Sequence, residues 1–187
     1  EFQRRYLSVI ERLAANILLI PASETETHNG PGGLFRLCLE LAFYCAQAAE
    51  GIVFAGRATA EDRRREEPRW RYAAFIAGLC CQLHRCIVSM TVVIEHGEVW
   101  PAVQEPLEGW LASHDGIDRY FVRWKKQSHQ GGASAGLMVT RIVPADCLQY
   151  IQDGSQRIIP IMMDVIAGIE TRERQPLFEL VNGMINR

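Results

Sequence analysis

Residues 80–86 bring thiol and imidazole side chains together, in the order Cys-Cys-Gln-Leu-His-Arg-Cys. If this segment is helical, Cys81 and His84 lie three residues apart and share one face. Zinc prefers such ligands, but structural zinc sites normally use paired Cys-x-x-Cys or His-x-x-x-His hooks, which do not occur here. The pattern therefore favours thiols packed in an apolar core and predicts no cofactor. A divalent transition metal on Cys81 and His84 stays the alternative.

Basic and aromatic side chains alternate in two segments that could contact single-stranded DNA, because cations bind phosphates and flat rings stack on bases. The first, residues 63–71, is interrupted by Glu66 and Glu67, which favours a solvated linker whose charges pair among themselves. The second, residues 119–126 (RYFVRWKK) with His129 nearby, carries fewer compensating charges. It predicts either a nucleic-acid contact or an edge strand with solvated charges.

Other catalytic patterns are weak. The loop Gly131–Gly136 follows an expected strand, but it lacks the Gly-Lys-Ser/Thr that a nucleotide-binding loop places at the start of its helix. Ser113, His114 and Asp115 are neighbours in the sequence, and adjacent side chains do not converge into a triad. These patterns therefore predict no catalytic residue.

The composition is that of one ordinary folded domain over residues 1–187, with 48% hydrophobic and 22% charged residues. The net charge of −2 provides no overall attraction to nucleic acid, so any such contact must be a local patch. No apolar run is long enough to insert into a membrane, and the six cysteines fit no secreted scaffold, which indicates a cytoplasmic protein. The first residues, EFQRRY, contain no Met or signal segment, so we expect a fragment of a longer protein.

Hydrophobic periodicity predicts a mainly helical fold with one small β insertion. Helices are expected over residues 4–19, 34–54, 70–90, 106–113, 133–142, 145–152, 158–169 and 176–186. The charged residues 57–68 are expected to connect two helices. Thr91–Glu95 and Glu98–Trp100 flank the turn residues His96-Gly97 and predict a β-hairpin, whereas residues 119–125 alternate as in a separate strand.

Several longer motifs follow one another along nearly the whole chain. They are Leu19–Glu24 (LIPASE) with His28–Leu34 (HNGPGGL), Glu67–Ala73 (EPRWRYA), Arg119–Trp124 (RYFVRW) and Arg141–Pro144 (RIVP). In this order they resemble the N-terminal HD-type domain of TraI-like relaxases, the MobH class of conjugative plasmids and integrative elements, often labelled "putative helicase". The resemblance implies an HD-like helical bundle and a role in the transfer of DNA between cells.

The resemblance also locates the metal ligands of an HD site, which uses histidines and aspartates to hold a divalent metal and activate water. At the corresponding positions this chain has Leu37, Cys81, Gln82 and Ile185. Leucine and isoleucine cannot ligate a metal, and glutamine is a weak neutral ligand. The resemblance therefore implies a degenerate HD domain without catalytic residues and without a metal.

Our leading hypothesis is a non-catalytic DNA-binding or assembly module that works with single-stranded DNA and conjugation proteins. The residues expected to contact DNA are His28, Arg36, Arg119, Arg123, Trp124, Lys125, Lys126 and His129. Two alternatives stay open: a metal-dependent phosphohydrolase or nuclease with ligands moved to Cys81, His84, His28 or His129, and a purely structural protein-interaction domain. The sequence leaves the oligomeric state undetermined.

Overall fold

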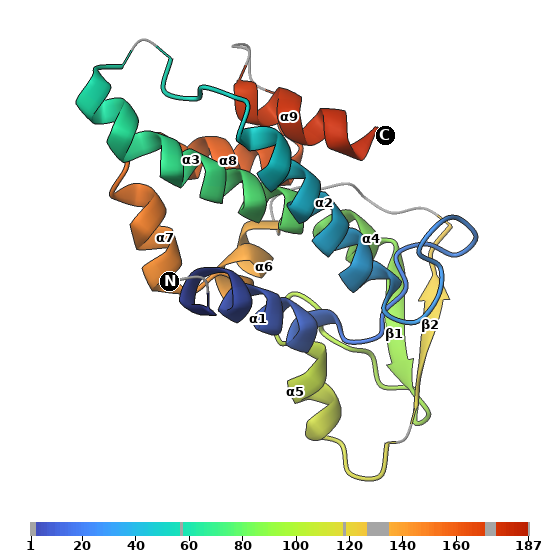
Figure 1. Ribbon diagram of the computed structural model, residues 1–187. Helices are drawn as coiled ribbons and strands as arrows, with labels where there is room; N and C mark the ends of the chain where they lie inside the picture. Colours follow the sequence, from blue (N-terminus) through green and yellow to red (C-terminus); the bar gives the residue numbers. More distant parts are fainter. Residues whose placement is uncertain (1–2, 57, 118, 127–134, 171–174, 187) are drawn as a thin grey trace. The chain divides into compact units, whose positions relative to one another are not determined.

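A computed structural model describes residues 3–56, 58–117, 119–126, 135–170 and 175–186. This part of the chain is mainly helical and contains a small two-stranded antiparallel sheet, which confirms the predicted fold class (Figure 1). None of its helices combines the length and the apolar character needed to cross a membrane. The chain divides into two compact units, each built from two separate stretches of sequence: residues 1–37 with 83–142, and residues 38–82 with 143–187.

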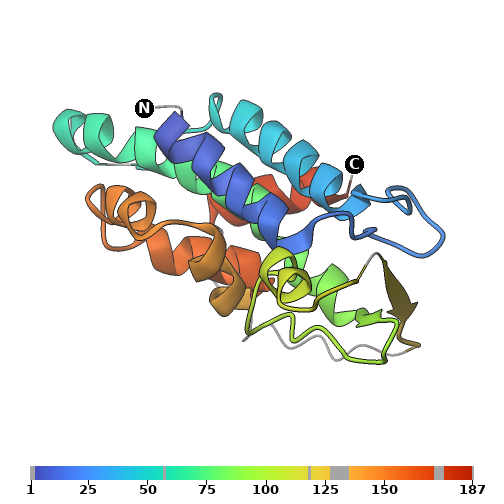
Figure 2. The same cartoon turned by 90° about the horizontal axis from the view of Figure 1, so that it is seen from below.

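The first unit combines short helices with the sheet. Its elements are the π-helical turn η1 (Gln3–Leu7), α1 (Ser8–Ile17), α4 (Leu83–Val88), β1 (Met90–Ile94), α5 (Leu107–Ala112), β2 (Tyr120–Trp124) and α6 (Ala135–Ile142). Helix α1 packs against α5 and α6 (Figure 2) and buries Leu13 and Ile17 completely. Because α1 comes first in the chain and α6 comes last in this unit, the core depends on contacts between distant segments.

The second unit is built around one long helix. Its elements are α3 (Ala60–Cys80), α7 (Ala145–Gln152), α8 (Ile158–Ala167) and α9 (Pro176–Ile185), together with most of α2 (Gly33–Ala49), which begins in the first unit. Helix α3 packs against α7, α8 and α9 (Figure 2). Its second half, from Tyr72 to Cys80, is buried at every position, as its continuous apolar sequence requires.

Helix α3 corrects two boundaries predicted from the sequence. Residues 60–68 of the predicted charged connection are helical, because α3 begins at Ala60 and passes through Pro68. The Thr59 hydroxyl accepts a hydrogen bond from the Asp62 amide (3.1 Å), which is a typical N-cap. The apolar run also does not continue as one helix to residue 90, since α3 ends at Cys80 and α4 begins at Leu83.

The sheet corrects the predicted hairpin. Strand β1 pairs along its whole length with β2, in a register that sets Val92 opposite Val122. The turn after β1 exists, but its return segment forms only a single bridge, between Val93 and Val99. Residues 119–125 are therefore the main partner of β1, and the predicted strand over that segment is confirmed. The expected helices over 106–113, 145–152, 158–169 and 176–186 are present with shifts of a few residues at their ends.

Candidate nucleic-acid interface

Strand β2 divides the predicted DNA-binding residues between two faces, because successive side chains of a strand point to opposite sides. Tyr120, Val122 and Trp124 are half-buried. They lie opposite buried residues of β1: Ile94, Val92 and Met90, respectively. The alternate positions form the other face and are all exposed: Arg119, Phe121, Arg123 and Lys125. We call these four residues the cationic face.

The aromatic side chain on the cationic face is Phe121, not the predicted Trp124. Phe121 is 48% exposed and lies opposite Val93, which in turn bridges to the exposed Val99. Residues directly opposite each other share a face, so these three side chains form an apolar row between the cations. Sequence reasoning singled out the tryptophan by residue type, although the strict alternation of RYFVRWK already separates Trp124 from Arg123.

The basic side chains of this region differ in whether an ion pair or a hydrogen bond within the protein engages them. Arg119 pairs with Glu95 across the strands (3.1 Å), and both side chains are largely exposed, so the pair contributes little to stability. The Lys125 ammonium donates a hydrogen bond to the Val88 carbonyl (3.2 Å). Within the described residues, no ion pair or side-chain hydrogen bond engages Arg123 or Lys126, and both are exposed. These two cations are the ones most available to an anionic ligand.

Loop 18–33 determines where His28 and Arg36 lie. The Ala22 amide bonds to the His28 carbonyl (2.9 Å), and the Leu34 amide bonds to the Ile20 carbonyl (3.0 Å), which fixes both ends of the loop. His28 is half-buried with a positive φ of 64°, and Arg36 is exposed on the first turn of α2. The LIPASE and HNGPGGL motifs thus build the loop itself.

Residues of this loop also approach β2. Pro21, Asn29 and Pro31 line a hollow of about 420 Å³ together with Tyr120 and Val122. Arg119 is part of the same hollow, so the loop that carries His28 borders the end of β2 where the cationic face begins.

The EPRWRYA motif has a structural role in the second unit. The Glu67 carboxylate accepts a hydrogen bond from the Ala55 amide (2.8 Å), and the Trp70 ring stacks on Phe54 with centroids 5.6 Å apart. The Arg69 guanidinium lies 4.8 Å from the centroid of the Tyr150 ring of α7. These contacts tie α3 to its neighbours and leave the motif with no free basic cluster.

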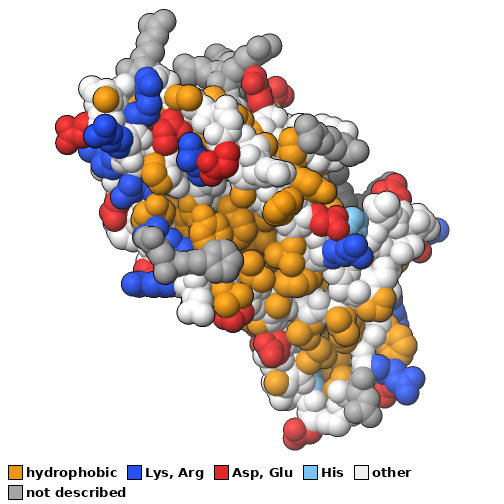
Figure 3. All heavy atoms as spheres, in the orientation of Figure 1, with side chains coloured by type: hydrophobic (Ala, Val, Ile, Leu, Met, Phe, Trp, Pro, Cys, Tyr) orange, Lys and Arg blue, Asp and Glu red, His pale blue; other side chains and the backbone are white. Residues whose placement is uncertain are grey.

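The basic run at the start of α3 is balanced by acidic partners. Arg65 pairs with Asp62 (2.7 Å), Arg71 with Glu50 (3.1 Å), and Glu66 with Arg157 (2.9 Å). Figure 3 shows positive and negative side chains mixed over this region. The charges of residues 63–71 are compensated, but the prediction that they pair among themselves in a linker is wrong: Arg65, Arg71 and Glu66 pair with residues outside the segment, and the segment is part of a helix.

The positions expected to be degenerate metal ligands lie on or beside helices. Leu37 is half-buried in α2, and Ile185 is the last residue of α9. Cys81 is buried at the C-terminal cap of α3 and donates to the Gly78 carbonyl (3.3 Å), and the half-buried Gln82 follows it. Because α3 ends before Cys81 and α4 begins after Gln82, Cys81 and His84 do not share one continuous helix.

The thiols of this region are poor ligands and nucleophiles at neutral pH. Burial raises the pKa of Cys80 to about 12 and that of Cys86 to about 11, which keeps both thiols protonated. Burial also lowers the pKa of His84 and favours its neutral form. Among the described residues, no group of three or more Cys, His, Asp or Glu side chains could hold a metal ion.

The structure brings Glu98 and Ser113 to the two ring nitrogens of His114, an arrangement that sequence adjacency did not predict. The Glu98 carboxylate lies 2.8 Å from Nε2, and the Ser113 hydroxyl lies 3.1 Å from Nδ1. However, the Trp110 carbonyl lies 2.7 Å from both Nδ1 and the hydroxyl, so both donate to this oxygen. The carbonyl and Glu98 raise the pKa of His114. Because Nδ1 donates its own hydrogen to the carbonyl, it cannot accept the proton of Ser113, and the three groups do not form a catalytic triad.

Two sequence predictions fall outside the described residues. His129, expected to contact DNA, lies in residues 127–134, and so do the first four residues of the loop Gly131–Gly136. The site therefore rests on β2, Lys126 and loop 18–33.

Fold and site together define a mainly helical protein that carries a small sheet with a basic and aromatic outer face. A family model described as "putative helicase", TraI_2, matches residues 1–187, so the chain belongs to this TraI-like family. No curated protein matches the sequence.

Proposed function

We propose that this chain is a degenerate HD-type domain of a TraI-like relaxase, that it acts in the transfer of a mobile genetic element, and that it holds single-stranded DNA on the cationic face. Its expected partners are the transferred strand and other conjugation proteins, and the expected compartment is the cytoplasm. Membership of the "putative helicase" family supports a role on DNA.

The observation that carries the DNA-binding proposal is the composition of one strand face. Three cations and an exposed aromatic ring alternate along β2 at positions 119, 121, 123 and 125. Residues two apart on a strand are separated by about 6.7 Å, so this face can follow an extended phosphate chain. Phe121 offers a ring on which any base can stack, independent of sequence. Glu95 is the one acidic residue that pairs with a described cation of this face.

The proposal assigns no catalytic role, for a chemical reason. Leu37 and Ile185 have no donor atom, and Gln82 is a neutral amide, so three of the four expected ligand positions cannot hold a divalent cation tightly. The fourth, Cys81, already donates its thiol proton to a backbone carbonyl. An apolar filling of a former metal site avoids burying charges without partners.

The test is a double substitution, Lys125→Ala with Lys126→Ala, measured by fluorescence anisotropy with a labelled single strand at several salt concentrations. We expect weaker binding and a shallower salt dependence. The slope of log K against log salt concentration should fall by about 0.7 for each phosphate contact that is lost.

The matched control is Arg12→Ala with Arg64→Ala, which removes the same charge from two exposed side chains on α1 and α3. This variant should bind like the parent, apart from a small uniform effect of net charge. If the lysine variant binds as tightly as the parent with the same salt slope, the cationic face is not the DNA-binding site.

A further inference from the structure

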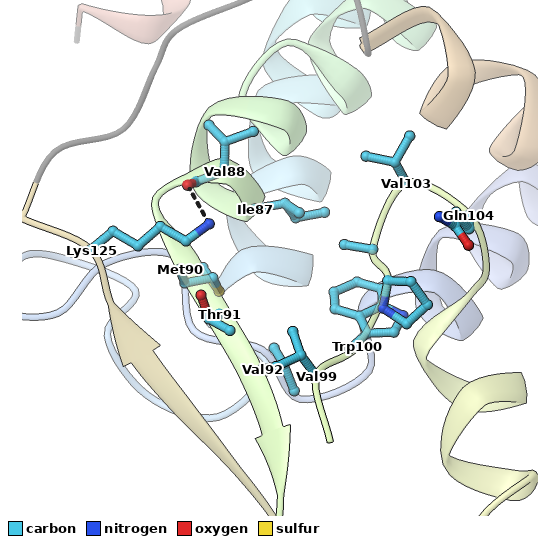
Figure 4. Close-up of a pocket in the computed structure, with 12 residues that line it drawn as sticks. Ile87, Val88, Met90, Thr91, Val92, Val99, Trp100, Val103, Gln104 and Lys125 are labelled. Atoms are coloured by element: carbon cyan, nitrogen blue, oxygen red, sulfur yellow. Dashed lines mark hydrogen bonds between the residues drawn. The ribbon is translucent and has the colours of Figure 1, made fainter. Parts of the chain in front are cut away.

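A cavity of about 320 Å³ lies beside the cationic face, between β1 and the segment that follows the turn (Figure 4). Its walls are mostly apolar. They come from the end of α4 and from β1 on one side, and from residues 99–104 on the other. The Trp100 ring forms part of the second wall, and its indole N–H donates to the Glu105 carbonyl (3.0 Å), which fixes the orientation of the ring. This hydrogen bond holds the indole ring in place in the wall of the cavity.

Polar groups lie at only a few points of the lining: Thr91, Gln104 and Lys125. Figure 4 shows the Lys125 side chain reaching from the end of β2 toward the Val88 carbonyl. Gln104 is exposed, and no side-chain hydrogen bond engages its amide within the described residues. Its amide offers one acceptor and two donor hydrogens. An apolar cavity with a few polar groups at its edge is typical of a small-molecule site.

The cavity and the cationic face share residues. Lys125 belongs to both, and Thr91 lies opposite Arg123 in the sheet. Val99 bridges to Val93, the neighbour of Phe121, and also lines the cavity. Because opposed residues share a face, a chain laid along the cationic face passes the side chains that border the cavity.

We infer that this cavity, which we call the base pocket, takes one unpaired nucleobase of a single strand held on the cationic face. The inference rests on the proposed function and adds the chemical group that the protein recognises. The base would lie against Trp100 and the valine walls, with its polar edge toward Gln104. The Lys125 ammonium would stay at the backbone of the same nucleotide.

The size and the apolar walls of the cavity suit one base of a single-stranded DNA. Ligand pockets typically have volumes of about 300–1,000 Å³. The volume of this cavity, about 320 Å³, is at the lower end of that range and suits one flat ring system. A base in a duplex could enter only after unstacking and unpairing, which costs a few kcal/mol, whereas a base in a single strand is already accessible. The base pocket thus provides a reason for preferring single strands.

The first experiment is photo-cross-linking of the unmodified protein to a short single-stranded oligonucleotide that contains one 5-iodouracil, followed by peptide mass spectrometry. Adducts within residues 99–104, with Trp100 as the most reactive side chain, would support the base pocket. Adducts confined to Phe121, with none in residues 99–104, would overturn it and leave DNA binding by the cationic face intact.

The second experiment fills the cavity with Val103→Trp and measures binding of the same oligonucleotide. We expect a loss of about tenfold, because contacts with a single base commonly change affinity by this order. The control, Val53→Trp, places the same large ring at an exposed valine of the second unit and should bind like the parent. If Val103→Trp lowers thermal stability, Gln104→Trp at the exposed edge replaces it.

The outcomes separate this inference from the proposed function. If the Val103→Trp variant, or the Gln104→Trp variant that replaces it, binds the oligonucleotide as tightly as the parent and the Val53→Trp control do, the base pocket is wrong and the proposed function stands. If the parent binds no single-stranded DNA at all, the proposed function is wrong, and the base pocket falls with it.

Discussion

At the scale of single residues, the backbone of loop 18–33 explains why the HNGPGGL motif needs glycine at its last two glycine positions. Gly32 has a φ of 74°, a conformation that L-residues with side chains rarely adopt. A Cβ on Gly33 would lie 1.8 Å from the His28 carbonyl oxygen, which is far inside van der Waals contact. Gly32 and Gly33 thus allow the loop to close on itself at the point where α2 begins.

We predict that Gly33→Ala destabilises the protein by at least about 2 kcal/mol, toward the upper end of the about 0.5–3 kcal/mol common for single substitutions. The reason is that the loop backbone must move to accommodate the methyl group, and the bonds at Ala22 and Leu34 depend on that backbone. Urea unfolding followed by circular dichroism measures the change. Gly30→Ala is the control, because no atom lies within 4 Å of its added Cβ. Equal stabilities of the two variants would contradict the prediction.

The cysteines show how environment decides the chemistry of a residue. Cys38, Cys45, Cys80, Cys81 and Cys147 are buried, and Cys86 is half-buried. Burial raises the pKa of Cys45 to about 12, as it does for Cys80, so these thiols behave as small apolar side chains. The sequence interpretation of packed thiols agrees with this burial.

At the scale of elements, α3 shows how a helix can begin in a highly charged segment. Residues 60–69 carry little apolar character, so hydrophobic periodicity alone did not indicate a helix there. The helix begins at the Thr59 cap. Two contacts with the segment between α7 and α8 stabilise its first turns: Arg157 binds Glu66, and Arg65 donates to the Gly154 carbonyl (3.2 Å). The Thr-x-x-Asp pattern of residues 59–62 was the local signal for this start.

We predict that Thr59→Ala lowers the free energy of unfolding by about 1 kcal/mol, because the first turn of α3 loses the acceptor for its Asp62 amide. Urea denaturation measures the difference. Thr25→Ala, at an exposed position in loop 18–33, is the matched control and should leave stability within about 0.5 kcal/mol of the parent. A Thr59 variant as stable as the Thr25 variant would show that the cap does not stabilise the helix.

At the scale of the whole molecule, each compact unit needs both halves of the chain. The first unit takes α1 from the start of the sequence and the sheet from its middle, and the second takes α3 from the first half and α7 to α9 from the end. A cut between residues 82 and 83 therefore leaves two fragments that each contain parts of both units. The expectation that residues 1–187 form a single domain stays a prediction.

We predict that fragments 1–82 and 83–187 are each poorly packed alone and regain native structure when mixed. The fragment 1–82 lacks the partners of α1 in α5 and α6, and it lacks the helices that pack against α3. Near-ultraviolet circular dichroism of each fragment and of the equimolar mixture tests this, with the intact chain as the reference. Native-like spectra from either fragment alone would contradict the prediction.

The sequence by itself determined the helical class and most helices of the second half of the chain, because α6 to α9 are amphipathic and bounded by Pro or Gly. It also located the cations of the candidate site, since residue type needs no structure. Only the tertiary structure decided the partner of β1, the contacts that hold the charged half of α3, and which of the two faces of β2 is exposed. Strand pairing joins residues far apart along the chain, so local periodicity cannot reveal that Val93 lies opposite Phe121 or that Gln104 borders the same cavity as Lys125.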